Sequence, residues 1–431
     1  MSILGYIVRH AVRQPYTPLY LCTLRFTAHA KSDPVHRTEN ITSCQTKMNF
    51  SLRGSGFFFR RSKELLNIAG NKRSVTTGVS TVNLRNVIKL SLYGAGIGTI
   101  IGGSYSIYKL NKPRAHILNR ETNLPLLEEA PDVTVSRKVQ VANDQSGLKL
   151  TLYQYQTCPF CCKVRAFLDY HGISYDVVEV DPVLRQSVKW STYKKVPILL
   201  AQVDNGYQIF QDSSMIVSAL SSYIRERGRE LQDITKSYPQ ISFIDENGTT
   251  KNEIMNRYFL MYDQPELKGL NTKEVNEERK WRKWADDVLV HTLSPNVYRT
   301  LDEAVQSFTW FSHVGEWDKH FPAWERYFII YVGAFAMWMI GKRLKARHNL
   351  KDNVRISLYD ECNYFAREVK VKGTPFMGGG NPNLADLAVY GILSSIEGCA
   401  AFQDALNNSN IKSWYFRMKT VVNEHQGSQF V

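Results

Sequence analysis

Three cysteines fall close together in the stretch YQYQTCPFCCKVRAFLDY, which begins at Tyr153. Cys158 and Cys161 enclose a Pro-Phe pair, and Cys162 follows directly. Thiols at this spacing can bind a metal, exchange a disulfide, or supply one thiolate as a nucleophile. The spacing alone leaves all three chemistries open.

A metal site is not expected at this motif. Structural zinc sites commonly use four ligands, as two Cys-x-x-Cys pairs or as one pair with nearby histidines. Here Cys362 and Cys399 stand alone in the sequence, and His171 lies on the helix that follows the motif. The seven cysteines are odd in number and scattered. A secreted disulfide framework is therefore not expected either, and a reducing environment is favoured.

A reactive thiolate at Cys158 is the better interpretation. The residue follows a strand and stands at the start of a helix, where Pro159 suits the first helical position. The free amides and the dipole at a helix start favour the thiolate and lower the pKa of the thiol. Cys161 lies one turn further along and is expected to support Cys158. Cys162 points about 100° away and is expected to pack.

Five further residues complete the candidate site. Tyr155 ends the strand before the motif, so its hydroxyl could reach the thiolate or a substrate, although plain packing is an equal alternative. Val196-Pro197 opens a later strand, where a cis peptide would present the Val196 backbone to an extended thiol peptide. Asp212 and Ser213 begin a helix, which suits a carboxylate and an amine. These pieces predict a glutathione-sized groove; the alternative is an inert pair of thiols on a thioredoxin-like scaffold.

Hydrophobic periodicity predicts the elements that position these residues. Residues 148–227 show strand, helix, strand, short helix, a hairpin turning at Asn205-Gly206, and a helix capped by Asp212. This order is that of a thioredoxin-like or glutaredoxin-like domain.

The remainder of the body is expected to be helical. Residues 228–252 are expected to form a loop insertion, and residues 253–431 a helical domain. Within that domain the uncharged run 327–340 is short for a membrane span, so a buried central helix is expected there.

The N-terminal part has a different character. The chain of 431 residues carries a net charge of +14, and residues 1–89 hold 14 Lys and Arg against three acids. The rest is nearly neutral, so no nucleic-acid-binding surface is expected. The basic, acid-poor leader is typical of a transit peptide or a disordered tail, and a second such segment begins at Met48.

Residues 90–108 lack charge and are expected to cross a membrane once as a helix, with residues 109–147 as a linker.

The motifs carry a family resemblance. Residues 148–224 resemble glutaredoxins and the N-terminal domain of glutathione transferases. The stretches KKVPILL, QDSS, RKWADDVLVH, SPNVYRT, KRLKARH and FMGGGNPNLADLAVYG extend the resemblance to the membrane-associated prostaglandin E synthase 2 family. The implied fold class is α+β, with a thioredoxin-like domain followed by an all-helical glutathione-transferase-like domain and preceded by a membrane anchor.

The resemblance also implies an activity. It implies an isomerase that converts prostaglandin H2 to prostaglandin E2 and is stimulated by thiols. It implies a homodimer that binds glutathione, and a glutathione–haem complex that shifts the outcome towards substrate breakdown. The family's catalytic cysteine corresponds to Cys158, with Tyr155 beside it. Its glutathione contacts correspond to Val196, Asp212 and Ser213. Matching positions that could line the pocket are His291, Ser294 and Arg343.

Three functions are carried forward. In the preferred one, the Cys158 thiolate cleaves the O–O bond of prostaglandin H2. In the second, a glutaredoxin-like thiol–disulfide oxidoreductase uses Cys161 as well. In the third, a membrane-tethered protein binds glutathione and haem without turnover. The leader favours the mitochondrion as the location, and the family's association with Golgi membranes is the alternative.

Overall fold

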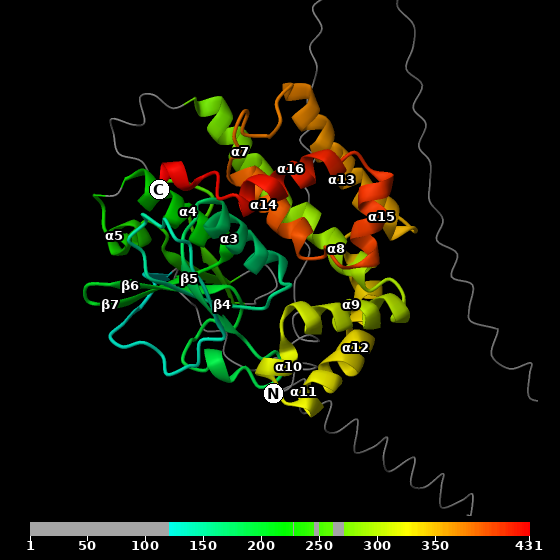
Figure 1. Ribbon diagram of the computed structural model, residues 1–431, viewed down its shortest axis with the longest axis horizontal. Helices are drawn as coiled ribbons and strands as arrows, with labels where there is room; N and C mark the ends of the chain where they lie inside the picture. Colours follow the sequence, from blue (N-terminus) through cyan, green and yellow to red (C-terminus); the bar gives the residue numbers. More distant parts are fainter. Residues whose placement is uncertain (1–119, 227, 245–249, 262–270) are drawn as a thin grey trace, which may run out of the picture. The chain divides into compact units, whose positions relative to one another are not determined.

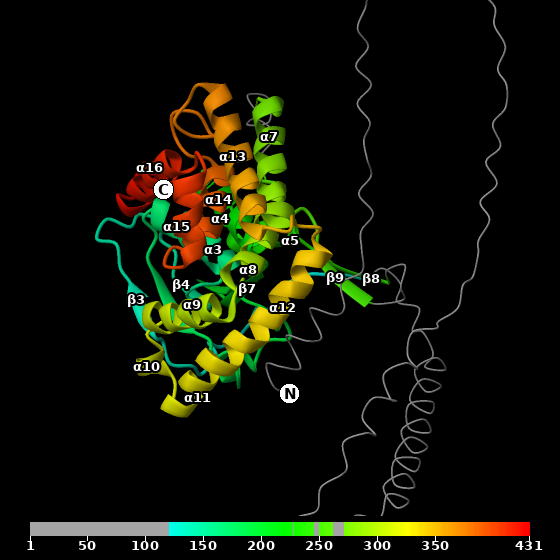
Figure 2. The same ribbon diagram turned by 90° about the vertical axis from the view of Figure 1, so that its right-hand side faces the viewer.

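The computed structural model describes residues 120–431, apart from residues 227, 245–249 and 262–270 (Figure 1). The expected leader (1–89) and the expected membrane helix (90–108) lie outside the described residues. The described part has a thioredoxin-type sheet with helices on it, followed by a helical region (Figures 1 and 2). This agrees with the expected thioredoxin-like and helical parts of the fold.

The sheet has six strands in the order β2-β7-β6-β4-β5-β3. Their bounds are β2 Leu126–Leu127, β3 Arg137–Val139, β4 Leu150–Gln154, β5 Tyr175–Glu179, β6 Ile198–Val203 and β7 Gly206–Gln211. β4 and β5 are parallel, and the other neighbours are antiparallel. Tyr153 pairs with Ile198, which pairs in turn with Gln211. The end of β4, the start of β6 and the end of β7 therefore meet at one end of the sheet.

Two helices carry the residues of that sheet end. α3 (Pro159–Tyr170) follows β4, and α4 (Ser213–Arg225) follows β7; the two helices pack together (Figure 1). Asp212 caps α4, because its Oδ1 accepts the amide hydrogens of Ser214 and Met215 at 2.9 and 3.2 Å. The predicted cap is thus confirmed.

The structure differs from the expected linker and loop insertion. β1 (Arg120–Thr122), β2 and β3 lie within residues 109–147, and β2 and β3 form the two edges of the main sheet. Residues 228–252 include α5 (Leu231–Lys236) and β8 (Gln240–Ile244), and β9 (Thr250–Ile254) follows. β1, β8 and β9 form a second sheet. Strands of two to five residues give too little alternation to be recognised, and their partners lie far away in the sequence.

The hairpin turn is shifted by one residue from its predicted position. β6 pairs with β7 up to Val203 and Gly206, so Asp204 and Asn205 form the turn. Gly206 has φ +133, and a Cβ on it would lie 2.1 Å from the carbonyl oxygen of Leu127 in β2. Glycine is required there because the edge strand approaches so closely.

The region after β9 is helical, as predicted. It comprises α7 Thr272–Trp284, the π-helical η2 Ala285–Leu289, α8 Val290–Val297, α9 Leu301–Val314, α10 Trp317–His320, α11 Ala323–Phe328, the π-helical η3 Ile329–Gly333, α12 Ala334–Arg347, α13 Val354–Lys372, α14 Leu384–Ser394, α15 Ala400–Asn408 and α16 Lys412–Asn423. α14 begins with a capping box formed by Asn383 and Asp386.

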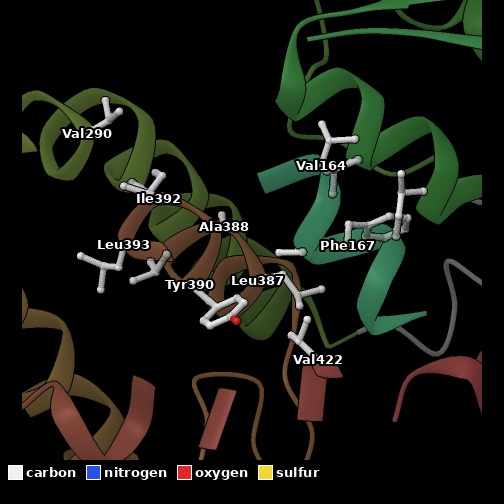
Figure 3. Packing of buried hydrophobic residues seen from close by; sticks show 14 of the residues in the cluster. Val164, Phe167, Val290, Leu387, Ala388, Tyr390, Ile392, Leu393 and Val422 are labelled. Carbon is white, nitrogen blue, oxygen red and sulfur yellow. The ribbon is translucent and has the colours of Figure 1, made fainter. Parts of the chain in front are cut away.

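The thiol-bearing helix α3 packs directly on α14. Figure 3 shows Val164 and Phe167 of α3 facing Leu387 of α14 in the buried cluster. A Cβ on Gly391 would lie 2.6 Å from the Cα of Lys163, so the two helix backbones meet at this glycine. This contact fixes the helical region against the helix that begins at Cys158.

One prediction about the helical region is wrong. α11, η3 and α12 form one continuous helix over residues 323–347, and only 28% of its apolar window is buried. Among the described residues it is the one helix long and apolar enough to cross a membrane. It packs on α8 and α9 along one face, while Tyr327, Tyr331 and Phe335 are about half exposed on the other. An uncharged run does not reveal that only one of its faces is covered.

Candidate functional site

Cys158 occupies the N-cap position of α3. Its backbone is extended (φ −75°, ψ 123°), and its amide donates to the carbonyl of Tyr155 at 3.1 Å. The carbonyl of Cys158 accepts the Cys162 amide at 2.9 Å. Cys158 is half-buried, whereas Cys161 and Cys162 are buried. Of the three thiols, Cys158 is therefore the one accessible from outside.

The thiols of Cys158 and Cys161 titrate in opposite directions. A hydrogen bond from the Cys161 thiol lowers the pKa of Cys158; burial opposes this, and the amides of Cys161 and Phe160 and the charge of Arg165 add to the lowering. Burial and the neighbouring Cys158 thiolate raise the pKa of Cys161 well above its usual value. Of the two thiols, Cys158 therefore ionises first, with a protonated Cys161 beside it.

Cys162 points to another side of α3. Its thiol donates to the carbonyl of Gln156 at 3.5 Å and accepts from Arg165 Nη2 at 3.1 Å. Burial raises the pKa of the Cys162 thiol. These contacts fit the packing role that was expected for it.

Cys158 opens onto an apolar cavity of about 360 Å³ between the sheet end and the helical region. That volume lies within the range of about 300–1,000 Å³ that is typical of small-molecule sites. Tyr155 and Pro159 line it beside Cys158. The wall from the helical region is almost entirely apolar or aromatic and consists of Tyr298, Phe308, Phe311, Trp317, Phe328, Ile329, Val332, Gly333, Ala336 and Met337. The site thus combines one thiolate with a large apolar surface.

Tyr298 is a residue of this cavity that the sequence analysis did not single out. It ends α8, and the charge of Cys158 acts on its hydroxyl. Burial first, then the charges of Cys399 and Cys158, raises the pKa of Tyr298, so its hydroxyl stays protonated and can donate. The motif SPNVYRT contained it, but nothing in that spacing indicated that the end of α8 would face Cys158.

The residues predicted to bind glutathione lie at the same end of the sheet but outside this cavity. The Val196–Pro197 peptide is cis, as predicted. By extension of the strand register, Val196 lies opposite Tyr155, and Pro197 lies opposite Asp212. The Asp212 carboxylate caps α4 and also accepts from Arg257 Nη1 at 3.3 Å, and Ser213 is buried at the first position of α4. The structure therefore places these residues beside the cavity rather than in its wall.

A buried polar cluster joins α3 and α4 to the helical region. Lys163 Nζ contacts Ser214 Oγ at 2.8 Å and Asp286 Oδ1 at 2.5 Å. Asp286 Oδ2 also accepts from the hydroxyls of Ser214 and Tyr258 at 2.6 and 3.0 Å. Asp286 lies in η2, a π-helical turn of the kind that often occurs at functional sites. No spacing in the sequence indicates this cluster, because its four members come from four distant segments.

A second cavity of about 190 Å³ lies against the first and shares Tyr298 with it. His291 and Ser294, which were expected as possible residues of the Cys158 pocket, line this second cavity instead, whereas Arg343 is exposed on α12 and lines neither cavity. The His291 ring stacks on His348 with centroids 4.1 Å apart, and burial lowers the pKa of His291.

Within the part of the chain that the structure describes, no three His, Cys, Asp or Glu side chains form a group that could hold a metal ion.

Comparison with known proteins identifies relatives of this chain. Residues 152–226 match the family model of the glutathione S-transferase N-terminal domain. The chain is 47% identical over 299 residues to prostaglandin E synthase 2 of Mus musculus, covering 69% of this chain and 76% of that protein. It is 41% identical over 355 residues to prostaglandin E synthase 2 of Danio rerio, covering 80% of this chain and 88% of that protein. Among solved structures, beta-etherase LigF from Sphingobium sp. strain SYK-6 has a TM-score of 0.37 and 15% identity, over 64% of this chain and 98% of that one.

Proposed function

The chain belongs to the prostaglandin E synthase 2 family, and on that premise we propose that it isomerises prostaglandin H2 to prostaglandin E2 through the Cys158 thiolate. One observation carries the proposal: the thiol with the lowered pKa opens onto the apolar cavity of about 360 Å³. Prostaglandin H2 is a fatty acid with two long, mainly apolar chains and a weak O–O bond, so it needs both a nucleophile and an apolar site.

The proposed reaction is a net isomerisation. The Cys158 sulfur bonds to one endoperoxide oxygen while the O–O bond breaks, and the other oxygen leaves as an alkoxide that takes up a proton. Loss of the C–H proton beside the sulfur-bound oxygen forms the ketone, and the S–O bond breaks to return the thiolate. One proton is gained and one is lost, so no external reductant is consumed. Cys161 need not form a disulfide in this cycle.

Tyr155 and Tyr298 are proposed to assist Cys158. Both line the cavity next to the thiol. Because burial keeps Tyr298 protonated, its hydroxyl can donate to the alkoxide oxygen as negative charge develops there. Tyr155 is proposed to orient the sulfur or to donate to the substrate.

Glutathione is proposed to bind beside the cavity, at the sheet end that carries Val196 and Asp212. The Ser213 amide at the start of α4 is proposed to hold a carboxylate, and the partly exposed Asp212 side chain offers negative charge for an amine. Val196 and Pro197 lie beside them at the start of β6 and would contact an extended peptide. The donor set fits the two ends of a small thiol peptide, which would supply the thiol that stimulates the reaction.

Haem fits this structure less well. His291 and Ser294 offer polar groups, but their cavity of about 190 Å³ lies below the about 300–1,000 Å³ that is typical of small-molecule sites. No step of the proposed reaction passes through haem.

Three further proposals concern the whole chain. Residues 90–108 are proposed to form a single membrane anchor, the protein is proposed to be a homodimer, and the mitochondrion is its proposed location. Imaging the full chain and a chain starting at Met48 tests that location against Golgi membranes.

A glutaredoxin-like thiol–disulfide oxidoreductase is the second candidate, because the Cys158 and Cys161 thiols are hydrogen-bonded. The full chain, wild type and Cys161→Ser, is assayed with prostaglandin H2 and with a glutathione mixed disulfide side by side. The isomerase predicts that Cys161→Ser keeps much of the prostaglandin E2 formation. Rapid disulfide reduction without prostaglandin E2 formation would favour the oxidoreductase. Cys362→Ser, at a buried thiol on α13, is the matched control.

A further inference from the structure

The helix over residues 323–347 carries an exposed apolar surface along its outer side. Seven large apolar side chains, spaced mostly three or four residues apart, are 36% to 60% exposed. We call them the aromatic face: Trp324, Tyr327, Phe328, Tyr331, Val332, Phe335 and Met339. Figure 2 shows α11 and α12 in line as one rod on the outside of the helical region. Apolar patches of this extent on a protein surface mark interaction sites.

The opposite side of the same helix forms a wall of the cavity at Cys158. Ile329, Gly333, Ala336 and Met337 line that cavity, and Phe328 and Val332 contribute to both sides. Within the described part of the chain, this helix alone therefore separates the aromatic face from the cavity, and its π-helical turn η3 lies at that place. Whatever covers the aromatic face lies next to the cavity.

The exposed charges carried by the helix itself have one sign, and the nearby acid Asp352 pairs with Lys345 at the end of the helix, 3.2 Å from its Nζ. Between residues 323 and 347 the one acid in the sequence is Glu325, which is 2% exposed. Lys342 and Arg343 are exposed where the face ends, and Lys342 Nζ lies 3.7 Å from the centroid of the Trp338 ring. Tryptophan and tyrosine side chains with nearby lysine and arginine are typical of helices that lie in the interface of a membrane.

We propose that the aromatic face lies on a lipid bilayer with anionic headgroups, and that the cavity at Cys158 receives its lipid substrate from that bilayer. The second half of this inference rests on the proposed function. The helix lies along the membrane surface rather than across the bilayer, because its inner side packs on α8 and α9 and carries the buried Glu325. At 1.5 Å per residue the aromatic face, from Trp324 to Met339, gives a contact about 23 Å long.

A second copy of the chain is a poorer partner for this face. If two copies met through this helix, neither helix would bring an exposed acid to pair with Lys342 and Arg343. Anionic headgroups supply that charge, and acyl chains supply the apolar contact.

Photo-crosslinking of the full chain tests the location. p-Benzoylphenylalanine replaces Tyr331 in one variant and Val371 in the other; Val371 is 76% exposed on α13, which lies far from α11 in both views (Figures 1 and 2). Each chain is irradiated on vesicles of phosphatidylcholine with phosphatidylserine. The proposal predicts phospholipid adducts at position 331 and few at position 371. An adduct to a second copy or to another segment of the same chain, or equal lipid adducts at both positions, overturns it.

Substrate delivery tests the second half. The double variant Tyr331→Glu/Phe335→Glu changes two exposed positions that do not line the cavity, and Val371→Glu is the control. Prostaglandin E2 formation from substrate loaded in vesicles is expected to fall several-fold for the double variant. Formation from substrate in detergent-free buffer is expected to stay at the wild-type level. Equal losses in both assays would contradict delivery from the bilayer. Because crosslinking needs no turnover, it gives its answer even if the proposed isomerase activity fails.

Discussion

Lys163 of α3 and Asp286 of η2 form a buried ion pair, with Nζ 2.5 Å from Oδ1 and side-chain exposures of 3% and 12%. The pair connects the helix that begins at Cys158 to the helical region that encloses the substrate cavity. Ser214 of α4 and the Tyr258 hydroxyl complete the set of partners around Asp286. The position of the thiol relative to the cavity is thus held by this ion pair as well as by the packing of α3 on α14.

Replacing Asp286 should destabilise the protein strongly. Asp286→Ala leaves the Lys163 ammonium buried without its partner, which costs about 3–5 kcal/mol of unfolding free energy. Urea unfolding of the full chain measures this. Asp287→Ala is the matched control, because its ion pair with Lys283 is exposed on both sides and is worth under about 1 kcal/mol. Similar losses for the two variants would contradict the role given to Asp286.

Glu325 should make stability fall as the pH rises. Burial first, and then the nearby Asp181, raises the pKa of Glu325. A raised folded-state pKa means that the contribution to stability is complete below the unfolded pKa and is lost as the pH rises through the folded pKa. Glu325→Gln should therefore gain stability relative to wild type from pH 4 to pH 8 in urea unfolding. A constant difference between the two proteins across that range would show that the pKa of Glu325 is not raised.

The Cys161 thiol should determine how reactive Cys158 is. Its hydrogen bond is the largest influence that lowers the pKa of Cys158, so Cys161→Ala should raise that pKa. At pH 7 the rate of alkylation of Cys158 by iodoacetamide, followed by mass spectrometry, should fall several-fold. Cys399→Ala is the control, since burial raises the pKa of that thiol to about 11 and it lies at the start of α15. An unchanged alkylation rate in Cys161→Ala would rule out this support.

Filling the cavity should weaken substrate binding. Ala336 lines the cavity, and Ala336→Phe should raise the KM for prostaglandin H2 about tenfold, which corresponds to about 1.4 kcal/mol. Ala346→Phe adds the same side chain at an exposed position of α12 outside the cavity and should leave KM unchanged. Steady-state kinetics measure both. Equal KM values for the two variants would place the substrate elsewhere.

The sequence predicts the elements that carry the thiol better than it predicts the cavity. Local signals locate β4, the start of α3 at Cys158 and the cap at Asp212, because alternation, a proline at the first helical position and an N-cap are properties of neighbouring residues. Such local signals do not predict the edge strands β2 and β3, because these short strands form by pairing with strands that are distant in the sequence.

The helical wall of the site could not be predicted for a related reason. Tyr298, Lys163 and Asp286 acquire their roles only when α8, α3 and η2 come together, and no periodicity in the sequence reports that contact. The uncharged run 327–340 was wrongly predicted to be a buried helix, because composition does not distinguish a buried helix from one with a single covered face. The reaction was inferred from the resemblance to a known family, whereas the cavity is visible only once the helices have packed together.

The most direct test of the account is the rate of prostaglandin E2 formation from prostaglandin H2 by the full chain with glutathione present, compared between wild type and Cys158→Ser. The account predicts that Cys158→Ser falls to the rate measured without enzyme, while Cys362→Ser keeps the wild-type rate and both variants unfold at the wild-type urea concentration. Full activity in Cys158→Ser would contradict the assignment of the Cys158 thiolate as the nucleophile.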